Sequence, residues 1–153
     1  MKLKIMTFNT QHCKNYLSKK IDYKSITNLI EEYNPDIIGL NEIYGFPFLK
    51  KFFSQSNRIA KNINYNHFFG VSTNLYFLPY GNAILSKYPI IKTEVIKIPY
   101  PKIKTGNKHY EKRSILKAEI LVNDEIINVY VIHFGLNTDE QINGINELLG
   151  GIL

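Results

Sequence analysis

The sequence contains one cysteine, no tryptophan and no long apolar run. Because Cys13 is the sole cysteine, the chain cannot form an internal disulfide or a zinc site built on several thiolates. No stretch approaches the roughly 18 consecutive apolar residues of a membrane span, and the amino terminus lacks the apolar core and cleavage site of a secretory signal. We therefore expect a soluble, cytoplasmic protein with no membrane span.

The residues that are present have the composition of a folded domain. Hydrophobic residues make up 44% of the chain and charged residues 21%, which argues against extensive disorder. A length of 153 residues corresponds to one domain. The net charge of +6 favours an anionic partner. The chain is also rich in Asn, Ile and Tyr, and a bias in genomic base composition explains this charge better than a dedicated nucleic-acid groove does.

Hydrophobic periodicity predicts a strand, a helix and a second strand in the first part of the chain. Residues 3–8 and 36–40 read as apolar strands, and residues 23–32 repeat apolar side chains at helical spacing. Pro35 separates the helix from the second strand, because the residue before a proline avoids the helical conformation. Within residues 46–63, the later part is predicted to be helical.

The middle of the chain predicts short strands separated by turns. A strand is expected over residues 65–69, followed by a loop over 70–80. Residues 82–86 and 90–98 are both apolar segments of strand type, and the intervening turn at 87–89 contains a proline. The spacing predicts that these two segments pair as a hairpin.

The last third begins with a loop over residues 99–112, which contains two prolines, a glycine and several lysines. Side chains then alternate between two faces along residues 114–122. Asn123-Asp124 forms a turn and residues 125–133 form the return strand, which predicts a second hairpin. Apolar residues at helical spacing follow Thr138, and this residue is the expected N-cap of a final helix.

Two polar residues follow the first two predicted strands. Asn9 comes directly after residues 3–8, and Glu42 follows residues 36–40 at a distance of two positions. Ligands of open α/β sheets bind outside the carboxyl ends of such buried strands. We therefore expect Asn9 and Glu42 to lie in one site.

Five segments occur in an order typical of one family and together span nearly the whole chain. They are Thr7-Phe8-Asn9 and residues 35–42, 81–90, 112–116 and 131–137. On these segments the sequence resembles the endonuclease/exonuclease/phosphatase superfamily, which includes pancreatic deoxyribonuclease, abasic-site endonucleases, neutral sphingomyelinases and inositol polyphosphate phosphatases. The resemblance implies an α/β fold, a two-sheet α/β sandwich, in which this chain supplies mainly the first sheet and its helices.

The resemblance also implies roles for five residues. Glu42 would be a catalytic residue and the ligand of Mg²⁺, or of Mn²⁺ in its place, because these hard cations prefer oxygen. Asn9 would orient a catalytic carboxylate or contact the phosphate, and His133 would bind a phosphate oxygen or assist the leaving group. Arg113 would bind the substrate phosphate through its guanidinium, and Asn82 would help to position the substrate.

Each of these residues also has a structural interpretation. Glu42 would then cap a strand end, Asn9 would be a turn residue and His133 a partly buried histidine with satisfied hydrogen bonds. In the same interpretation, Arg113 would be a solvated loop residue and Asn82 would pack a turn. His12 lies close to Asn9 in the sequence, and we expect a structural role for it.

Two motifs of the family have no counterpart in this sequence. They are a Gly-Asp-Phe-Asn-like segment, which supplies a catalytic carboxylate and an amide, and a Ser-Asp-His-like segment, which supplies a histidine polarised by an acid. We therefore expect residues 1–153 to form a single but incomplete domain that lacks its carboxyl-terminal part. The inner face of its first sheet would be uncovered, which favours self-association through that face.

The expected function is metal-dependent hydrolysis of a phosphodiester or phosphomonoester, with little or no activity in this chain alone. Nucleic acid, a phospholipid headgroup or an inositol phosphate would be the substrate, and the fold does not choose among them. One alternative is a non-catalytic protein that binds phosphorylated ligands or nucleic acid. Another is a truncated gene product without a function of its own.

Overall fold

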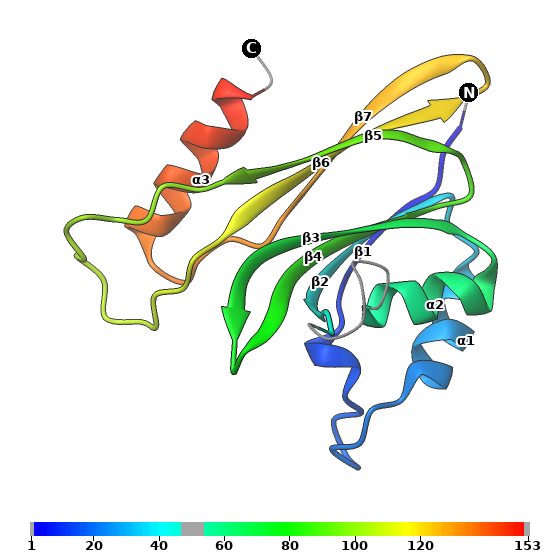
Figure 1. Ribbon diagram of the computed structural model, residues 1–153, viewed down its shortest axis with the longest axis horizontal. Coiled ribbons are helices and arrows are strands. Elements are labelled where there is room, and N and C mark those ends of the chain that lie inside the picture. Colours follow the sequence, from blue (N-terminus) through cyan, green and yellow to red (C-terminus); the bar gives the residue numbers. More distant parts are fainter. Residues whose placement is uncertain (1, 47–53, 152–153) are drawn as a thin grey trace.

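Two β-sheets and three α-helices make up the computed structural model, which describes residues 2–46 and 54–151 (Figure 1). The strands are β1 (Ile5–Asn9), β2 (Ile37–Tyr44), β3 (Asn66–Leu75), β4 (Leu78–Ser86), β5 (Ile90–Lys97), β6 (Ser114–Val122) and β7 (Glu125–Ile132). One sheet has the strand order β1-β2-β4-β3, and the other has the order β5-β6-β7. The expected two-sheet α/β sandwich is confirmed.

The helices are α1 (Tyr23–Tyr33), α2 (Gln55–Ile63) and α3 (Thr138–Gly150). α1 and α2 lie on the outer face of the four-stranded sheet, whereas α3 lies at the far side of the molecule beside the segment that joins β5 to β6 (Figure 1). Both α1 and α2 confirm predicted helices, and residues 47–53 of the predicted mixed segment lie outside the described residues. Within the described ranges, we find no helix with the length and apolarity needed to cross a bilayer.

Strands β2 and β4 are buried on both faces. On one face, Ile38 and Leu85 pack with Ile30 of α1 and Ile59 of α2. On the opposite face, other side chains of β2 and β4 pack against β6 and β7 in a second core, which contains Ile37, Ile84, Leu116, Ala118, Ile120, Val122 and Val131. This double burial explains why β2 and β4 appear in the sequence as continuous apolar runs rather than as alternating ones.

The second core corrects the expectation of an uncovered inner sheet face. β4 contacts β6 and β2 contacts β7 across the interface between the sheets, so the three-stranded sheet covers the inner face of the first. These three strands belong to the chain itself. The reason for expecting self-association through that face is thereby removed.

The predicted hairpin of residues 82–86 and 90–98 is wrong. β4 and β5 belong to different sheets, and β4 pairs with β3 instead. The connection crosses from one sheet to the other: Lys87 N donates to the carbonyl of Asp36, the residue before β2, and Pro89 O accepts from Leu121 N of β6. The predicted loop over 70–80 is in fact the β3–β4 hairpin.

The predictions for the end of the chain are largely confirmed. β6 and β7 form the expected hairpin, and Asn123 and Asp124 at its turn have φ values of 49° and 66°, as a type I′ turn requires. α3 begins at Thr138, but its N-cap is Asn137, one residue earlier. The Asn137 backbone N–H and side-chain Nδ2 both donate to Glu140 Oε2, at 3.2 and 2.8 Å.

Candidate functional site

The neighbouring strands β1 and β2 bring Asn9 and Glu42 together, as the strand pattern predicted. These strands are parallel, and Asn9 lies opposite Asn41 in the register. Asn9 Nδ2 donates to Glu42 Oε1 at 2.9 Å, while Asn9 Oδ1 accepts from the backbone N–H of Gln11 at 3.0 Å. The amide of Asn9 is thus oriented from one side, and it orients the carboxylate from the other.

Glu42 lies within a strand and not at its end, which corrects the predicted boundary. β2 continues to Tyr44, and its register with β4 shifts between Leu40 and Ile43. Glu42 occupies this β-bulge with a φ of 61°, an unfavourable conformation for a residue with a side chain. The Thr10 hydroxyl lies 3.0 Å from Asn41 O and 3.1 Å from Glu42 O and donates to these carbonyls, which holds the bulge in place.

The bulge is the kind of strained feature that concentrates at functional sites. Asn41 projects to the buried side, where Nδ2 donates to Asn82 Oδ1 at 2.9 Å. The Glu42 carboxylate is directed to Asn9 and retains 21% exposure. A ligand in solvent can therefore reach Glu42.

His133 follows β7 directly and approaches the same carboxylate, with Nε2 at 3.9 Å from Glu42 Oε1. Its other ring nitrogen, Nδ1, lies 2.7 Å from NH1 of Arg113. Because a guanidinium can only donate, Nδ1 must be the acceptor and the imidazole proton is on Nε2. His133 therefore presents an N–H group toward Glu42.

Burial and the Arg113 charge lower the pKa of His133, with the Glu42 carboxylate opposing them. The imidazole is consequently neutral at pH values near 7.

Arg113 precedes β6 and is held by two partners. Its NH2 group lies 2.9 Å from Glu111 Oε2, and its NH1 group donates to His133. The Arg113 side chain is only 11% exposed, and its Nε has no hydrogen-bond partner among the described residues. Glu111 was not predicted from the sequence, although residues two apart in an extended segment project to the same side.

His12 belongs to the same cluster, although we expected a structural role for it from the sequence. Its Nε2 lies 3.8 Å from Glu42 Oε2, on the other oxygen from the one that His133 approaches. Its ring stacks on Tyr44 with the centroids 4.6 Å apart, and burial lowers its pKa against the opposing Glu42 charge. In the sequence, the closeness of His12 to Asn9 was the signal that could have placed it in the site. Its φ of 59° could not be predicted.

Asn82 lies behind the site and is almost completely buried. The sequence predicted that Asn82 would begin a strand, but it lies in the middle of β4. Besides accepting from Asn41, it donates to Ser114 O at 3.3 Å. The Ser114 hydroxyl in turn bonds that of Ser72 at 2.6 Å. This buried chain of hydrogen bonds links the bulge in β2 to both sheets.

The oxygen donors at this site suit a hard cation that keeps part of its hydration shell. They do not form a complete cage of protein ligands. Among the residues described here, no group of three His, Cys, Asp or Glu side chains is arranged to hold a metal ion. The site does offer the Glu42 carboxylate beside the Asn9 amide. Mg²⁺ commonly uses one or two carboxylates, keeps several waters and takes substrate phosphate as a further ligand. The residues present fit such a site.

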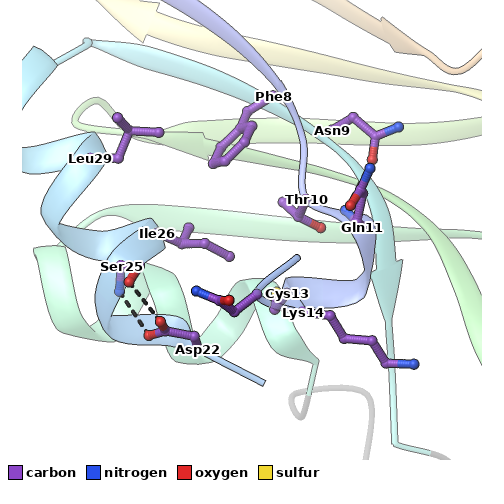
Figure 2. Close-up of a pocket in the computed structure, with 11 residues that line it drawn as sticks. Phe8, Asn9, Thr10, Gln11, Cys13, Lys14, Asp22, Ser25, Ile26 and Leu29 are labelled. Carbon is purple, nitrogen blue, oxygen red and sulfur yellow. Dashed lines mark hydrogen bonds between the residues drawn. The ribbon is translucent and has the colours of Figure 1, made fainter. Parts of the chain in front are cut away.

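A pocket of about 400 Å³ adjoins Asn9 (Figure 2). Figure 2 shows that it lies between the end of β1 and the first turn of α1, where Asp22 caps the helix by accepting two hydrogen bonds from Ser25. Cys13 also lines it, but burial raises the pKa of this thiol to about 12. The thiol is therefore protonated and is not a nucleophile at neutral pH.

Three histidines, His12, His67 and His133, are expected to reduce stability at mildly acidic pH. Burial lowers the pKa of each in the folded state. Their contribution to stability is therefore fully present above the unfolded pKa of about 6.5 and is lost as the pH falls toward the lower folded values. We expect Tm to fall by a few degrees between about pH 7.5 and about pH 5.5, measured by circular dichroism.

The hydrogen bond from the Lys4 backbone N–H lowers the pKa of the Asp36 carboxyl, so this group stays ionised throughout this window. The H67Q variant should show a weaker pH dependence of Tm than the parent protein. The H109Q variant is the matched control, because His109 is exposed. A Tm that stays constant or rises on acidification would contradict the prediction.

Comparison with known proteins agrees with this fold. The family model described as "Endonuclease/Exonuclease/phosphatase family" matches residues 6–115. No curated protein matches the chain. An endonuclease/exonuclease/phosphatase from Beutenbergia cavernae superposes with a TM-score of 0.73 at 19% identity, over 98% of this chain and 43% of that one.

Two further solved structures are similar. ANGEL2, a 2′,3′-cyclic phosphatase, has a TM-score of 0.70 and 16% identity over 98% of this chain and 46% of its own. D. rerio TDP2, complexed with a single strand DNA product, has a TM-score of 0.66 and 14% identity over 98% of this chain and 54% of its own. The chain thus spans about half the length of these structures, and at these identities the similarity shows the fold.

Proposed function

Because the chain belongs to the endonuclease/exonuclease/phosphatase family, we propose that its Glu42 site serves the metal-dependent hydrolysis of phosphate esters. The observation that carries this proposal is the convergence on one carboxylate. Asn9 donates to Glu42, and His12 and His133 approach its two oxygens from the segments that follow β1 and β7. Such a cluster of strand-end polar groups around a strained, accessible acid is typical of a catalytic site.

Glu42 would hold Mg²⁺, or Mn²⁺ in its place, and the substrate phosphate would complete the ligand set. When bound, the cation supplies positive charge that stabilises the phosphoryl oxygens in the transition state. Asn9 keeps the Glu42 carboxylate oriented through its Nδ2 group. Its remaining role is to contact the phosphate without adding charge.

His133 is the proposed donor to a phosphoryl oxygen. Its proton is on Nε2, on the side of the ring that faces Glu42, because Arg113 occupies Nδ1. A neutral imidazole in this tautomer can donate a hydrogen bond to the ester or to the leaving group. Arg113 acts on the reaction through His133, and its charge also favours a bound phosphate.

The named functions of two structural neighbours agree with a phosphate-ester substrate. One neighbour is a 2′,3′-cyclic phosphatase and the other was crystallised with a DNA product. Turnover by this chain alone is expected to be slow. The reason is that the sequence has no Gly-Asp-Phe-Asn-like or Ser-Asp-His-like segment to supply the carboxylate and the acid-polarised histidine that activate water.

The proposal predicts slow hydrolysis of bis(4-nitrophenyl) phosphate by the purified chain. The reaction should require Mg²⁺ or Mn²⁺ and should stop when EDTA is added, because Glu42 needs a cation to bind the ester. Titration of Mn²⁺ followed by electron paramagnetic resonance measures cation binding independently of turnover. Hydrolysis that persists in EDTA, or the absence of both Mn²⁺ binding and hydrolysis, would contradict the proposal.

A non-catalytic role in binding phosphorylated ligands is the second candidate. It is favoured because Glu42 stands at the site without further metal ligands. Among the described residues, no group of three His, Cys, Asp or Glu side chains is placed to hold a metal ion. In that case phosphate esters would bind in EDTA and would remain intact when a cation is supplied. Product formation in the chromogenic assay therefore discriminates the two functions.

A further inference from the structure

The segment that joins β5 to β6 has a net charge close to that of the whole protein. Residues 98–113 include five basic side chains and one acidic one, so this segment accounts for +4 of the net +6. It runs beside α3, far from α1 and α2 (Figure 1). A positive field concentrated on one segment attracts polyanions to that part of the surface.

The basic segment is fastened to the first turn of α3. Asp139 Oδ2 accepts from Thr105 N at 3.1 Å and from the Tyr110 hydroxyl at 2.7 Å. Asn137 Oδ1 accepts from Lys108 N at 2.9 Å, and Glu140 Oε1 accepts from Glu111 N at 3.1 Å. Because these bonds hold the backbone, the cost of ordering the segment on binding a ligand is reduced.

The two ends of this segment form one side of a pocket of about 500 Å³, and the last residues of β3 form the other. Lys97 projects across it and donates from Nζ to the backbone carbonyl of Ser72 at 3.0 Å. Burial and the nearby Lys112 charge both lower the pKa of Lys97. A bound anion would relieve the repulsion between these lysines.

Arg113 connects this pocket to the Glu42 site. It lines the pocket and also donates to His133, whose opposite nitrogen faces Glu42. A ligand with one phosphate group at Glu42 and the next in the pocket would therefore pass Arg113. This arrangement suits a chain of phosphates rather than an isolated one.

An aromatic platform borders the pocket. Tyr100 lines the pocket with 38% exposure and packs edge-on against Tyr110 at 6.4 Å between centroids. Lys104 Nζ lies 5.1 Å from each of these rings. Aromatic faces beside lysines are the combination by which proteins hold unpaired bases while their phosphates are neutralised.

We propose that this pocket, between β3 and the basic segment, binds a nucleotide of a single-stranded nucleic acid adjacent to the ester at Glu42. Lys97 and Lys112 contact its phosphate, and Tyr100 stacks on its base. The inference rests on the proposed function, because it extends the substrate from that site. A single strand is favoured over a duplex, since a base must be unpaired to stack on Tyr100 in a concave pocket.

The test measures binding of fluorescein-labelled oligo(dT) to the full chain by fluorescence anisotropy in EDTA. The K112E variant should bind at least about tenfold more weakly at about 50 mM salt, and its salt dependence should fall by about 0.7 in logarithmic slope. K24E is the matched control, because Lys24 is an exposed residue of α1 on the other side of the molecule. Equal losses for K112E and K24E would overturn the proposal.

Tyr100 variants test the stacking contact separately. Y100A should weaken binding by about tenfold or more, whereas Y100F should bind like the parent chain because it keeps the ring. Retention of full affinity by Y100A would overturn the role of the ring. Equal affinity for a DNA duplex would overturn the single-strand preference. Binding to phosphatidylserine vesicles that K112E abolishes, without binding to the oligonucleotide, would identify a membrane surface instead.

Failure of this inference is distinguishable from failure of the proposed function. Cation-dependent hydrolysis of bis(4-nitrophenyl) phosphate without oligonucleotide binding would overturn the pocket assignment and leave the phosphoesterase function standing. Oligonucleotide binding that depends on Lys112 and Tyr100, without ester hydrolysis, would support the pocket and count against catalysis.

Discussion

Replacement of Glu42 by glutamine is expected to reduce cation-dependent hydrolysis of bis(4-nitrophenyl) phosphate by at least about 100-fold, because loss of the ligand charge removes several kcal/mol of transition-state stabilisation. Glutamine has nearly the same shape as glutamate and still accepts the hydrogen bond from Asn9 Nδ2. The variant therefore tests the charge of the carboxylate and leaves the packing of the bulge unchanged. Initial rates at saturating Mn²⁺ measure the effect.

E94Q is the matched control for this experiment. Glu94 is exposed on β5, so the substitution removes the same charge at a position away from the site. E42Q should also lose Mn²⁺ affinity in the resonance titration, while E94Q should keep it. If E42Q hydrolysed the ester at the parent rate with the same Mn²⁺ dependence, Glu42 would not be the metal ligand.

Replacement of Gly81 by alanine is expected to cause the largest loss of stability among the substitutions considered. A Cβ atom at this position of β4 would lie 2.0 Å from Gly70 O and 2.8 Å from Ser72 N, both backbone atoms of β3. No side-chain rotation can relieve this overlap, so the two strands must separate where their register shifts. We expect a loss of at least about 4 kcal/mol in the free energy of unfolding, measured by urea denaturation.

Two other glycines serve as controls. Gly150 lies in α3 and a Cβ there would meet no atom within 4 Å, so G150A should be neutral or stabilising by up to about 1 kcal/mol. At Gly39 the Cβ would meet Val131 Cγ2 at 2.9 Å, a side-chain atom that can shift. G39A should therefore be less damaging than G81A. A G81A variant with the parent's urea midpoint would contradict the prediction.

The strands and helices that depend on local sequence patterns could be predicted. The β6–β7 hairpin follows from alternation around Asn123-Asp124, two residues that readily adopt positive φ. The β3–β4 hairpin was missed because Tyr76 and Phe77 occupy its turn with φ values of 50° and 66°. Bulky aromatic residues are poor turn formers, so only the pairing of the strands on either side explains this conformation.

The candidate site divides in the same way. Asn9 and Glu42 could be expected to meet, because parallel neighbouring strands end at the same edge of a sheet. The approach of His12 to Glu42 and the Glu111–Arg113 ion pair could not. Each depends on a side-chain direction set by a loop or by a bulge, and a sequence pattern carries no information on either.

The sequence by itself determined most of the strands and helices, and it indicated that the amide of Asn9 and the carboxylate of Glu42 would meet beside β1 and β2. These properties depend on the local periodicity of apolar residues and on the backbone preferences of a few residues. Only the tertiary structure decided that β4 and β5 separate into two sheets, that Glu42 turns out of a bulge, and that Arg113 orients His133. Those features arise from contacts between residues distant in the chain, whose free energy outweighs the local preferences of the segments involved.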